Sequence, residues 1–129
     1  MPLKIELKPG ERLIVGKALI TNDKERTRFY IEGNVPILRE KFVMMPNETN
    51  TPCKRVYYII QEIYLEKNLE EMQEKYFQEI KDITLAAPSL LPFIDAISQD
   101  ILCGNYYNAL KGAMALIGKE KELMDSINH

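Results

Sequence analysis

Residues 3–41 read LKIELKPGERLIVGKALITNDKERTRFYIEGNVPILREK, and this stretch decides the fold class. Leu3, Ile5 and Leu7 alternate with charged residues, which is the two-residue period of a strand with one buried face. The same alternation recurs over residues 26–32, where Arg and Tyr occupy one face and Thr, Phe and Ile the other. The pattern predicts four or five short strands in a small antiparallel sheet or barrel.

Turn residues divide this stretch into its strands. Pro9-Gly10 is a strong turn signal, and Gly16-Lys17 interrupts the aliphatic run of residues 12–21, which therefore forms either two strands or one bulged strand. Residues 22–25 are polar and predict a hairpin loop. Residues 35–43 predict a last strand, and the proline near its start suits a strand end or a sheet edge.

Helical periodicity replaces the strand pattern in the second part of the chain. Thr51 and Pro52 form a good helix start, because threonine can cap a helix and proline fits its first position. Asn68 with Glu71 resembles the capping box of a second helix, and Ser89 can cap a third. Gly104 is expected to end the third helix, and Asn105 to begin a fourth. We expect the charged tail of the fourth helix, over residues 120–129, to fray.

The order of strands first and helices second predicts an α+β fold. We expect a β-rich module over residues 1–45, a linker over residues 46–52 and a bundle of about four helices over residues 53–129. A module of 45 residues buries too little surface to be comfortable alone, so it should dock on the helices or pair with another copy. Because the edges of a short sheet are unpaired, we expect pairing with another copy, which gives a homodimer or higher homo-oligomer.

Composition excludes several classes of protein. The chain has 129 residues, of which 46% are hydrophobic and 28% charged, as in an ordinary soluble domain. No apolar run approaches the length that spans a bilayer, and the N-terminus lacks the apolar core of a secretory signal. We therefore expect a cytoplasmic protein without a membrane partner.

Charge is unevenly distributed along the chain. Residues 1–47 carry nine Lys/Arg against six Asp/Glu, whereas residues 48–129 carry eight against thirteen. The basic front permits a polyanionic partner for that half only, although chance asymmetry in a small protein explains the imbalance as well.

Groups that could perform catalysis or hold a metal are scarce. The single histidine is His129, at the end of the chain, where it cannot be held in a fixed position. A Ser-His-Asp triad or a Cys-His pair would therefore lack its general base. Cys53 lies beside two cations near a predicted helix start, where it is either a reactive thiol or an inert small residue. Cys103 lies among apolar residues and predicts a core position. We expect no enzyme, no metal and no cofactor.

The basic front carries the remaining candidate site. Guanidinium groups and an aromatic ring on a sheet surface suit single-stranded RNA, because phosphates bind arginine and unstacked bases stack on rings. An ordinary sheet face with salt bridges to Glu6, Glu11, Glu32 and Glu40 is the alternative interpretation. The candidate RNA-binding residues are Arg39, Arg12, Arg26, Arg28, Lys41 and Lys4.

Several motifs resemble the family of the flagellum biosynthesis repressor FlbT. They are LKPGER, ITND, RTRFYIEG and PILREK in the front half, followed by TPCKR, IYL, AAPS and GNYYNALK. The resemblance implies a post-transcriptional regulator that binds the 5′ untranslated region of flagellin mRNA and represses translation or promotes mRNA decay. It also implies FlaF, a small companion protein, and flagellin as partners.

The first 45 residues also resemble the carbon storage regulator CsrA. The resemblance rests on Lys8-Pro9-Gly10-Glu11, Val15-Gly16, Val35-Pro36 and Arg39-Glu40. It implies a dimer made by exchanging strands, and it assigns RNA contact to Arg39. Leu7 departs from the pattern, because that family has a basic residue there, so Lys4, Arg12 or Arg28 would have to compensate.

A function of a different class competes with RNA binding. The helical half carries aromatic and methionine residues, and most should be core because they recur at helical spacing. Phe77 follows the inward Tyr76, and Tyr107 follows Tyr106, so one of each pair is a candidate for exposure. An exposed aromatic patch would favour a protein-interaction module or chaperone that binds flagellin or FlaF.

Overall fold

The computed structural model describes residues 2–127 and has the predicted α+β fold, with five short strands followed by four helices. The chain divides into two compact units, Met1–Val43 and Met44–His129. The boundary thus lies two residues before the predicted end of the β module. His129, the one histidine, lies outside the described residues.

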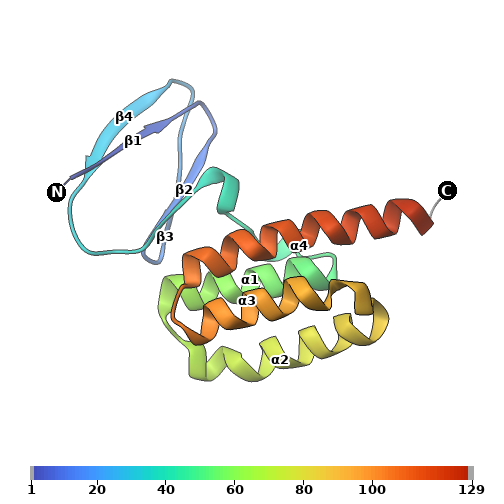
Figure 1. Cartoon of the computed structure of the whole chain (residues 1–129). Helices are drawn as coiled ribbons and strands as arrows, with labels where there is room; N and C mark the ends of the chain where they lie inside the picture. Colours follow the sequence, from blue (N-terminus) through green and yellow to red (C-terminus); the bar gives the residue numbers. More distant parts are fainter. Residues whose placement is uncertain (1, 128–129) are drawn as a thin grey trace. The chain divides into compact units, whose positions relative to one another are not determined.

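The first unit contains two small antiparallel sheets (Figure 1). One is a two-stranded ribbon of β1 and β4, and the other has the strand order β3-β2-β5. The strands are β1 (Leu3–Leu7), β2 (Arg12–Val15), β3 (Ala18–Thr21), β4 (Thr27–Ile31) and β5 (Ile37–Arg39). The last strand is shorter than expected, because the chain turns into a 3-10 helix directly after it.

The turns explain how two sheets arise from one run of strands. Gly16, with φ of +62°, turns the chain between β2 and β3, so the aliphatic run forms two paired strands. The segment after β3 is not the hairpin loop predicted, because β3 and β4 belong to different sheets. Asn22 holds this crossing, since its side-chain amide donates to the carbonyl oxygens of Leu7 (3.1 Å), Lys8 (2.9 Å) and Glu25 (2.9 Å).

The hydrophobic core of the β unit is small. Ile5, Leu7 and Leu13 are buried in it, and four further apolar side chains are only partly covered. They are Val15, Phe29, Ile31 and Ile37. The alternation of residues 3–7 is confirmed, because the side chains at positions 5 and 7 face this core. The same unit also buries Ile14, Leu38, Phe42 and Val43, and polar contacts add to the order of so small a unit.

The second unit contains four α-helices (Figure 1). Helix α1 packs against α2 and α4, and α4 also packs against α3. The helices are α1 (Pro52–Glu66), α2 (Leu69–Ala86), α3 (Leu91–Leu102) and α4 (Tyr106–Ile127).

Helix α1 begins where the sequence predicted, and α4 helps to close its first turn. The hydroxyl of Thr51 accepts a hydrogen bond from the amide of Lys54, and Pro52 is the first helical residue. The Glu120 carboxylate accepts from the Thr51 hydroxyl (2.6 Å) and from the amide of Cys53 (3.1 Å). The prediction that the chain frays from residue 120 is therefore wrong over residues 120–127, because this contact anchors α4 and the helix continues to Ile127. The last two residues of the predicted tail lie outside the described residues.

Two predicted caps do not form. Asn68 precedes α2, but its backbone at φ −101° and ψ 41° is not extended, so its side chain makes no capping hydrogen bond. Ser89 lies inside a 3-10 turn over Pro88–Leu90, and α3 begins only at Leu91. Gly104 does follow α3 with φ of +78°, which confirms the predicted glycine stop.

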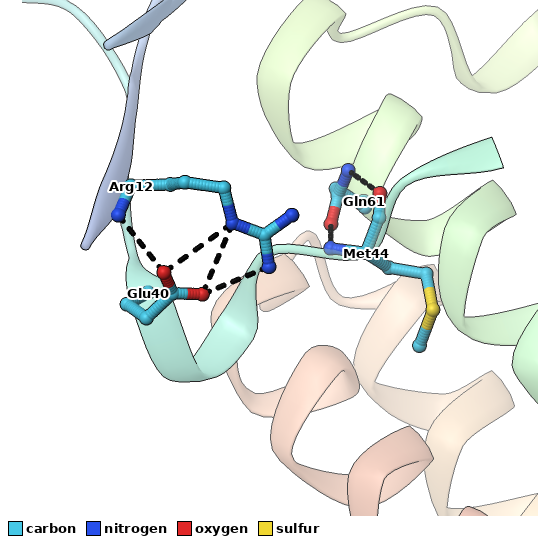
Figure 2. Close-up of polar contacts among 4 residues, drawn as sticks. All are labelled: Arg12, Glu40, Met44 and Gln61. Atoms are coloured by element: carbon cyan, nitrogen blue, oxygen red, sulfur yellow. Dashed lines mark hydrogen bonds and ion pairs between the residues drawn. The ribbon is translucent and has the colours of Figure 1, made fainter. Parts of the chain in front are cut away.

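The segment before α1 is tied to the helical unit by one buried amide. Gln61 is 3% exposed, and Figure 2 shows its side chain meeting both backbone groups of Met44. The Met44 amide donates to Gln61 Oε1 (2.8 Å), and Gln61 Nε2 donates to the Met44 carbonyl oxygen (2.9 Å). Met44, which the sequence placed near the end of the β module, thus begins the helical unit and is held there by α1.

We predict that Gln61→Leu lowers the free energy of unfolding by ~1–3 kcal/mol, because leucine leaves the two Met44 groups without these partners. Chemical denaturation followed by circular dichroism measures the change. Gln73→Leu, at an exposed position of α2, is the matched control and should be close to neutral. Equal stability of the two variants would show that the Gln61 hydrogen bonds contribute nothing.

Candidate nucleic-acid interface

The solvent side of the β1–β4 ribbon brings the first group of candidate residues together. Strand pairing places Lys4 opposite Tyr30 and Glu6 opposite Arg28. These four side chains face away from the core, because the alternate positions of the ribbon supply it. Tyr30 is 62% exposed, so its ring is available to a ligand.

Glu6 lies between the two cations of this face. Its Oε1 atom is 3.1 Å from Arg28 Nε and 3.9 Å from Lys4 Nζ. All three side chains are well exposed, and ion pairs in such a position are weak and screened by salt. A phosphate group can therefore compete with Glu6 for either cation.

Arg39 and Lys41 form a second group beside β5. Both are exposed, and together with Ile5 and Leu13 they line a cleft of about 220 Å³. Glu6 lines the same cleft, so the two groups of cations meet at this residue. The Lys41 ammonium lies 5.0 Å from the centroid of its neighbour's ring, Phe42.

Arg12 occupies a different environment, which Figure 2 shows. Its Nη2 atom lies 2.9 Å from Glu40 Oε2, and its Nε atom lies 3.3 Å from both carboxylate oxygens. The Arg12 backbone amide also donates to Glu40 Oε1 (2.9 Å). The Arg12 hydrogen bonds hold the pKa of Glu40 below its ordinary value, against the opposing effect of burial. Arg12 thus joins the start of β2 to the residue after β5.

Arg26 is exposed in the loop that leads into β4, two residues before Arg28. The six residues predicted from the sequence are thus distributed over four settings, of which this loop is one. Lys4 and Arg28 share the ribbon face, Arg39 and Lys41 share the cleft, and Arg12 is engaged by Glu40.

A family model described as "Flagellar protein FlbT" matches residues 3–124. The chain belongs to the FlbT family. The FlbT model covers both the β unit and the helical unit as far as residue 124 in α4, so the relationship is not confined to the basic front.

Curated relatives support the same assignment. The chain is 44% identical over 124 residues to a "Probable flagellum biosynthesis repressor protein FlbT" of Rhodopseudomonas palustris, covering 96% of this chain and 98% of that protein. It is 47% identical over 124 residues to "Probable flagellum biosynthesis repressor protein FlbT 1" of Bradyrhizobium diazoefficiens, covering 95% and 85%. The "Flagellum biosynthesis repressor protein FlbT" of Caulobacter vibrioides is 29% identical over 131 residues, covering 99% and 93%. No solved structure matches this FlbT-family chain.

The cysteines of this FlbT-family chain are both unpaired and lie in contrasting places. Cys53 is fully buried, and burial, followed by the charge of Glu120, raises the pKa of its thiol to about 12. The inert interpretation of Cys53 is therefore confirmed. The core position predicted for Cys103 is wrong, because this residue caps the end of α3 and its side chain is exposed.

Other kinds of site find little support within residues 2–127. That part of the chain contains no group of three or more His, Cys, Asp or Glu side chains placed to hold a metal. None of its helices combines the length and the apolar character needed to cross a membrane.

The sequence singled out the exposed cations of both groups but not the position of Glu6 between Lys4 and Arg28. Glu6 was considered only as one possible salt-bridge partner among four. The signal was present, since the two-residue period places Lys4 and Glu6 on one face of β1. The pairing of β1 with β4, which brings Arg28 and Tyr30 to that face, is a long-range contact that no local pattern encodes.

We predict that Glu40→Gln destabilises the β unit by about 1–2 kcal/mol near neutral pH, because Arg12 loses a charged acceptor. Since the folded-state pKa of Glu40 is lowered, its stabilisation is complete above the ordinary value of 4.5 and is lost as the pH falls through the folded-state value. The difference between wild type and variant should therefore shrink in acid.

Amide hydrogen exchange of β2 across a pH series measures this difference. Glu32→Gln, an exposed glutamate after β4, is the control and should leave exchange unchanged. A constant difference between wild type and Glu40→Gln at all pH values would contradict the proposed dependence on the carboxylate.

Proposed function

We propose that this chain represses flagellin synthesis after transcription by binding the 5′ untranslated region of flagellin mRNA through its β unit. Repression of flagellum biosynthesis is what the names of the FlbT relatives state. Binding at the leader would occlude the ribosome or expose the message to decay. The chain itself would perform no chemistry and act in the cytoplasm.

The observation that carries the RNA proposal is the position of Tyr30. Its exposed ring lies opposite Lys4 and two residues along β4 from Arg28. An aromatic ring between cations suits single-stranded RNA, because a base can stack on the ring while adjacent phosphates contact the cations. Arg39 and Lys41 would continue the phosphate path beside the cleft, and Arg26 would extend it from the loop. Arg12 would contribute least, because Glu40 engages its guanidinium.

A homodimer or higher homo-oligomer belongs to the same proposal. Within the described residues, β2 is the one strand with partners on both sides, so each of the other four has an unpaired edge. Pairing of such edges between two copies would bury more apolar area around a small core and would place two RNA-binding faces in one particle.

A protein-interaction function remains a second candidate, with FlaF or flagellin as the partner. Tyr76 is buried, whereas Phe77 is 52% exposed. Tyr107 is also more exposed than its neighbour Tyr106, so one residue of each pair is exposed, as the sequence predicted. Phe77, with Leu85 and Leu91, lines a groove of about 330 Å³ between α2 and α3. Partners captured equally before and after ribonuclease treatment would favour this function.

We predict that Arg39→Glu weakens binding to a flagellin mRNA leader about tenfold and lowers the slope of affinity against salt by about one phosphate contact. Binding of the purified full chain to leader and scrambled RNA across a salt series measures both quantities. Lys121→Glu, the same charge reversal at an exposed site of α4, is the matched control. Arg39→Glu that binds the leader as tightly as wild type would refute the Arg39 assignment.

We predict separately that Tyr30→Ala costs ~1–3 kcal/mol of RNA-binding free energy, whereas Tyr30→Phe retains binding because the stacking ring remains. The same binding assay at one salt concentration measures the loss. Tyr107→Ala removes an exposed ring from the helical unit and should leave RNA affinity unchanged. An equal loss for Tyr30→Phe would point to the hydroxyl group and against stacking.

A further inference from the structure

A cleft of about 560 Å³ lies between α1 and α2, in the helical unit and outside the candidate RNA-binding surface. Its volume is within the range of sites that hold small ligands or peptide side chains. Apolar groups in it come from Tyr58, Ile59 and Met72, and Ile59 is buried. The remaining lining residues are Thr49, Arg55, Glu71, Glu74, Lys75, Gln78 and Glu79.

The charges that line this cleft leave a negative excess. Arg55 Nε lies 3.0 Å from Glu79 Oε1, so this ion pair joins α1 to α2 and its two charges cancel. The other charged lining residues are Glu71 and Glu74 against Lys75, and all three are exposed. A cationic group entering the cleft can therefore find carboxylates without first breaking the Arg55–Glu79 pair.

The negative region continues along α1. Burial raises the pKa of the Tyr58 phenol, and the neighbouring charges of Glu62 and Glu66 raise it further. The carboxylates of Glu62 and Glu66 near Tyr58 therefore disfavour a phosphate-bearing ligand on this side of α1.

We propose that the α1–α2 cleft binds a peptide segment of a partner protein in which Lys or Arg residues flank an aliphatic residue. The cations would pair with Glu71 and Glu74, and the aliphatic side chain would contact Met72 and Ile59. This inference goes beyond RNA binding, because it assigns the helical unit a ligand of opposite charge. It also differs from the apolar α2–α3 groove, which offers one lysine and one aspartate and no acidic excess.

The probe is a fluorescein-labelled synthetic peptide of repeated Lys-Leu-Leu-Lys units, titrated with the full chain and followed by fluorescence anisotropy. A Lys-Ser-Ser-Lys peptide tests the apolar contribution, and a Glu-Leu-Leu-Glu peptide tests the sign of charge. We expect the Lys-Leu peptide to bind, the Lys-Ser peptide to bind about tenfold more weakly and the Glu-Leu peptide not to bind.

Two double variants locate the binding. Glu71→Lys with Glu74→Lys reverses the cleft acids, whereas Glu122→Lys with Asp125→Lys makes the same charge change, at the same spacing, on the exposed end of α4. The cleft variant should lose affinity for the Lys-Leu peptide about tenfold more than the α4 variant. Glu71→Gln with Glu74→Gln is the second test, because it avoids repulsion at the start of α2, and it should lose affinity in the same direction.

Equal losses for the cleft and α4 variants would overturn the proposal, since binding would then reflect the acidity of the helical unit as a whole. Equal binding of the Lys-Leu and Lys-Ser peptides would also overturn it, because the apolar floor would have no role. Neither result bears on RNA binding, which is measured with a different ligand and different residues. A flagellin leader RNA that competed with the peptide would instead place the nucleic acid in the cleft and refute a peptide site.

Discussion

The ion pair between Arg12 and Glu40 is the interaction on which the β unit depends. Only seven apolar side chains are buried within residues 2–43, so polar contacts must help to fix the relative positions of the strands. Glu40 accepts hydrogen bonds from both the backbone and the guanidinium of Arg12, which joins the start of β2 to the end of β5. Because a charged, partly buried acceptor with several donors is directional, it specifies register where apolar area is scarce.

The same pair shapes the proposed interface. Arg39 and Lys41 flank Glu40 in the chain, so fixing the glutamate also fixes where these two cations enter the solvent. Glu6 has the corresponding role on the ribbon, where it lies between Lys4 and Arg28. The two glutamates differ in their environment, because Glu40 is held by several hydrogen bonds and Glu6 is exposed. Lys4 and Arg28 can therefore leave Glu6 for another anion at a small cost in free energy. Arg12 would have to give up several hydrogen bonds to Glu40 to do the same.

In the helical unit, side chains form hydrogen bonds with backbone groups that lie far away in the sequence. Glu120 of α4 closes the first turn of α1, and Gln61 of α1 satisfies the backbone of Met44. The local sequence gives no partner for these backbone groups, which would otherwise have to hydrogen-bond to water. The acidic residues that line the α1–α2 cleft outnumber the basic ones by one, whereas the β unit presents exposed cations. Opposite charges on separate units allow one chain to hold two different kinds of ligand.

The features that depend on local periodicity and backbone chemistry could be predicted from the sequence. The alternation in LKIEL and TRFYI specified strands, the glycine at position 16 specified a turn, and Thr51-Pro52 specified a helix start. The sequence also supplied the candidate cations, since arginine and lysine on short strands are visible without a structure. Other features required the folded structure: which strands pair, the binding of Arg12 by Glu40, the position of Tyr30 opposite Lys4, and the continuation of α4 past Glu120. The physical reason is that each of these outcomes is a contact between residues distant in the chain, whose free energy no local pattern contains.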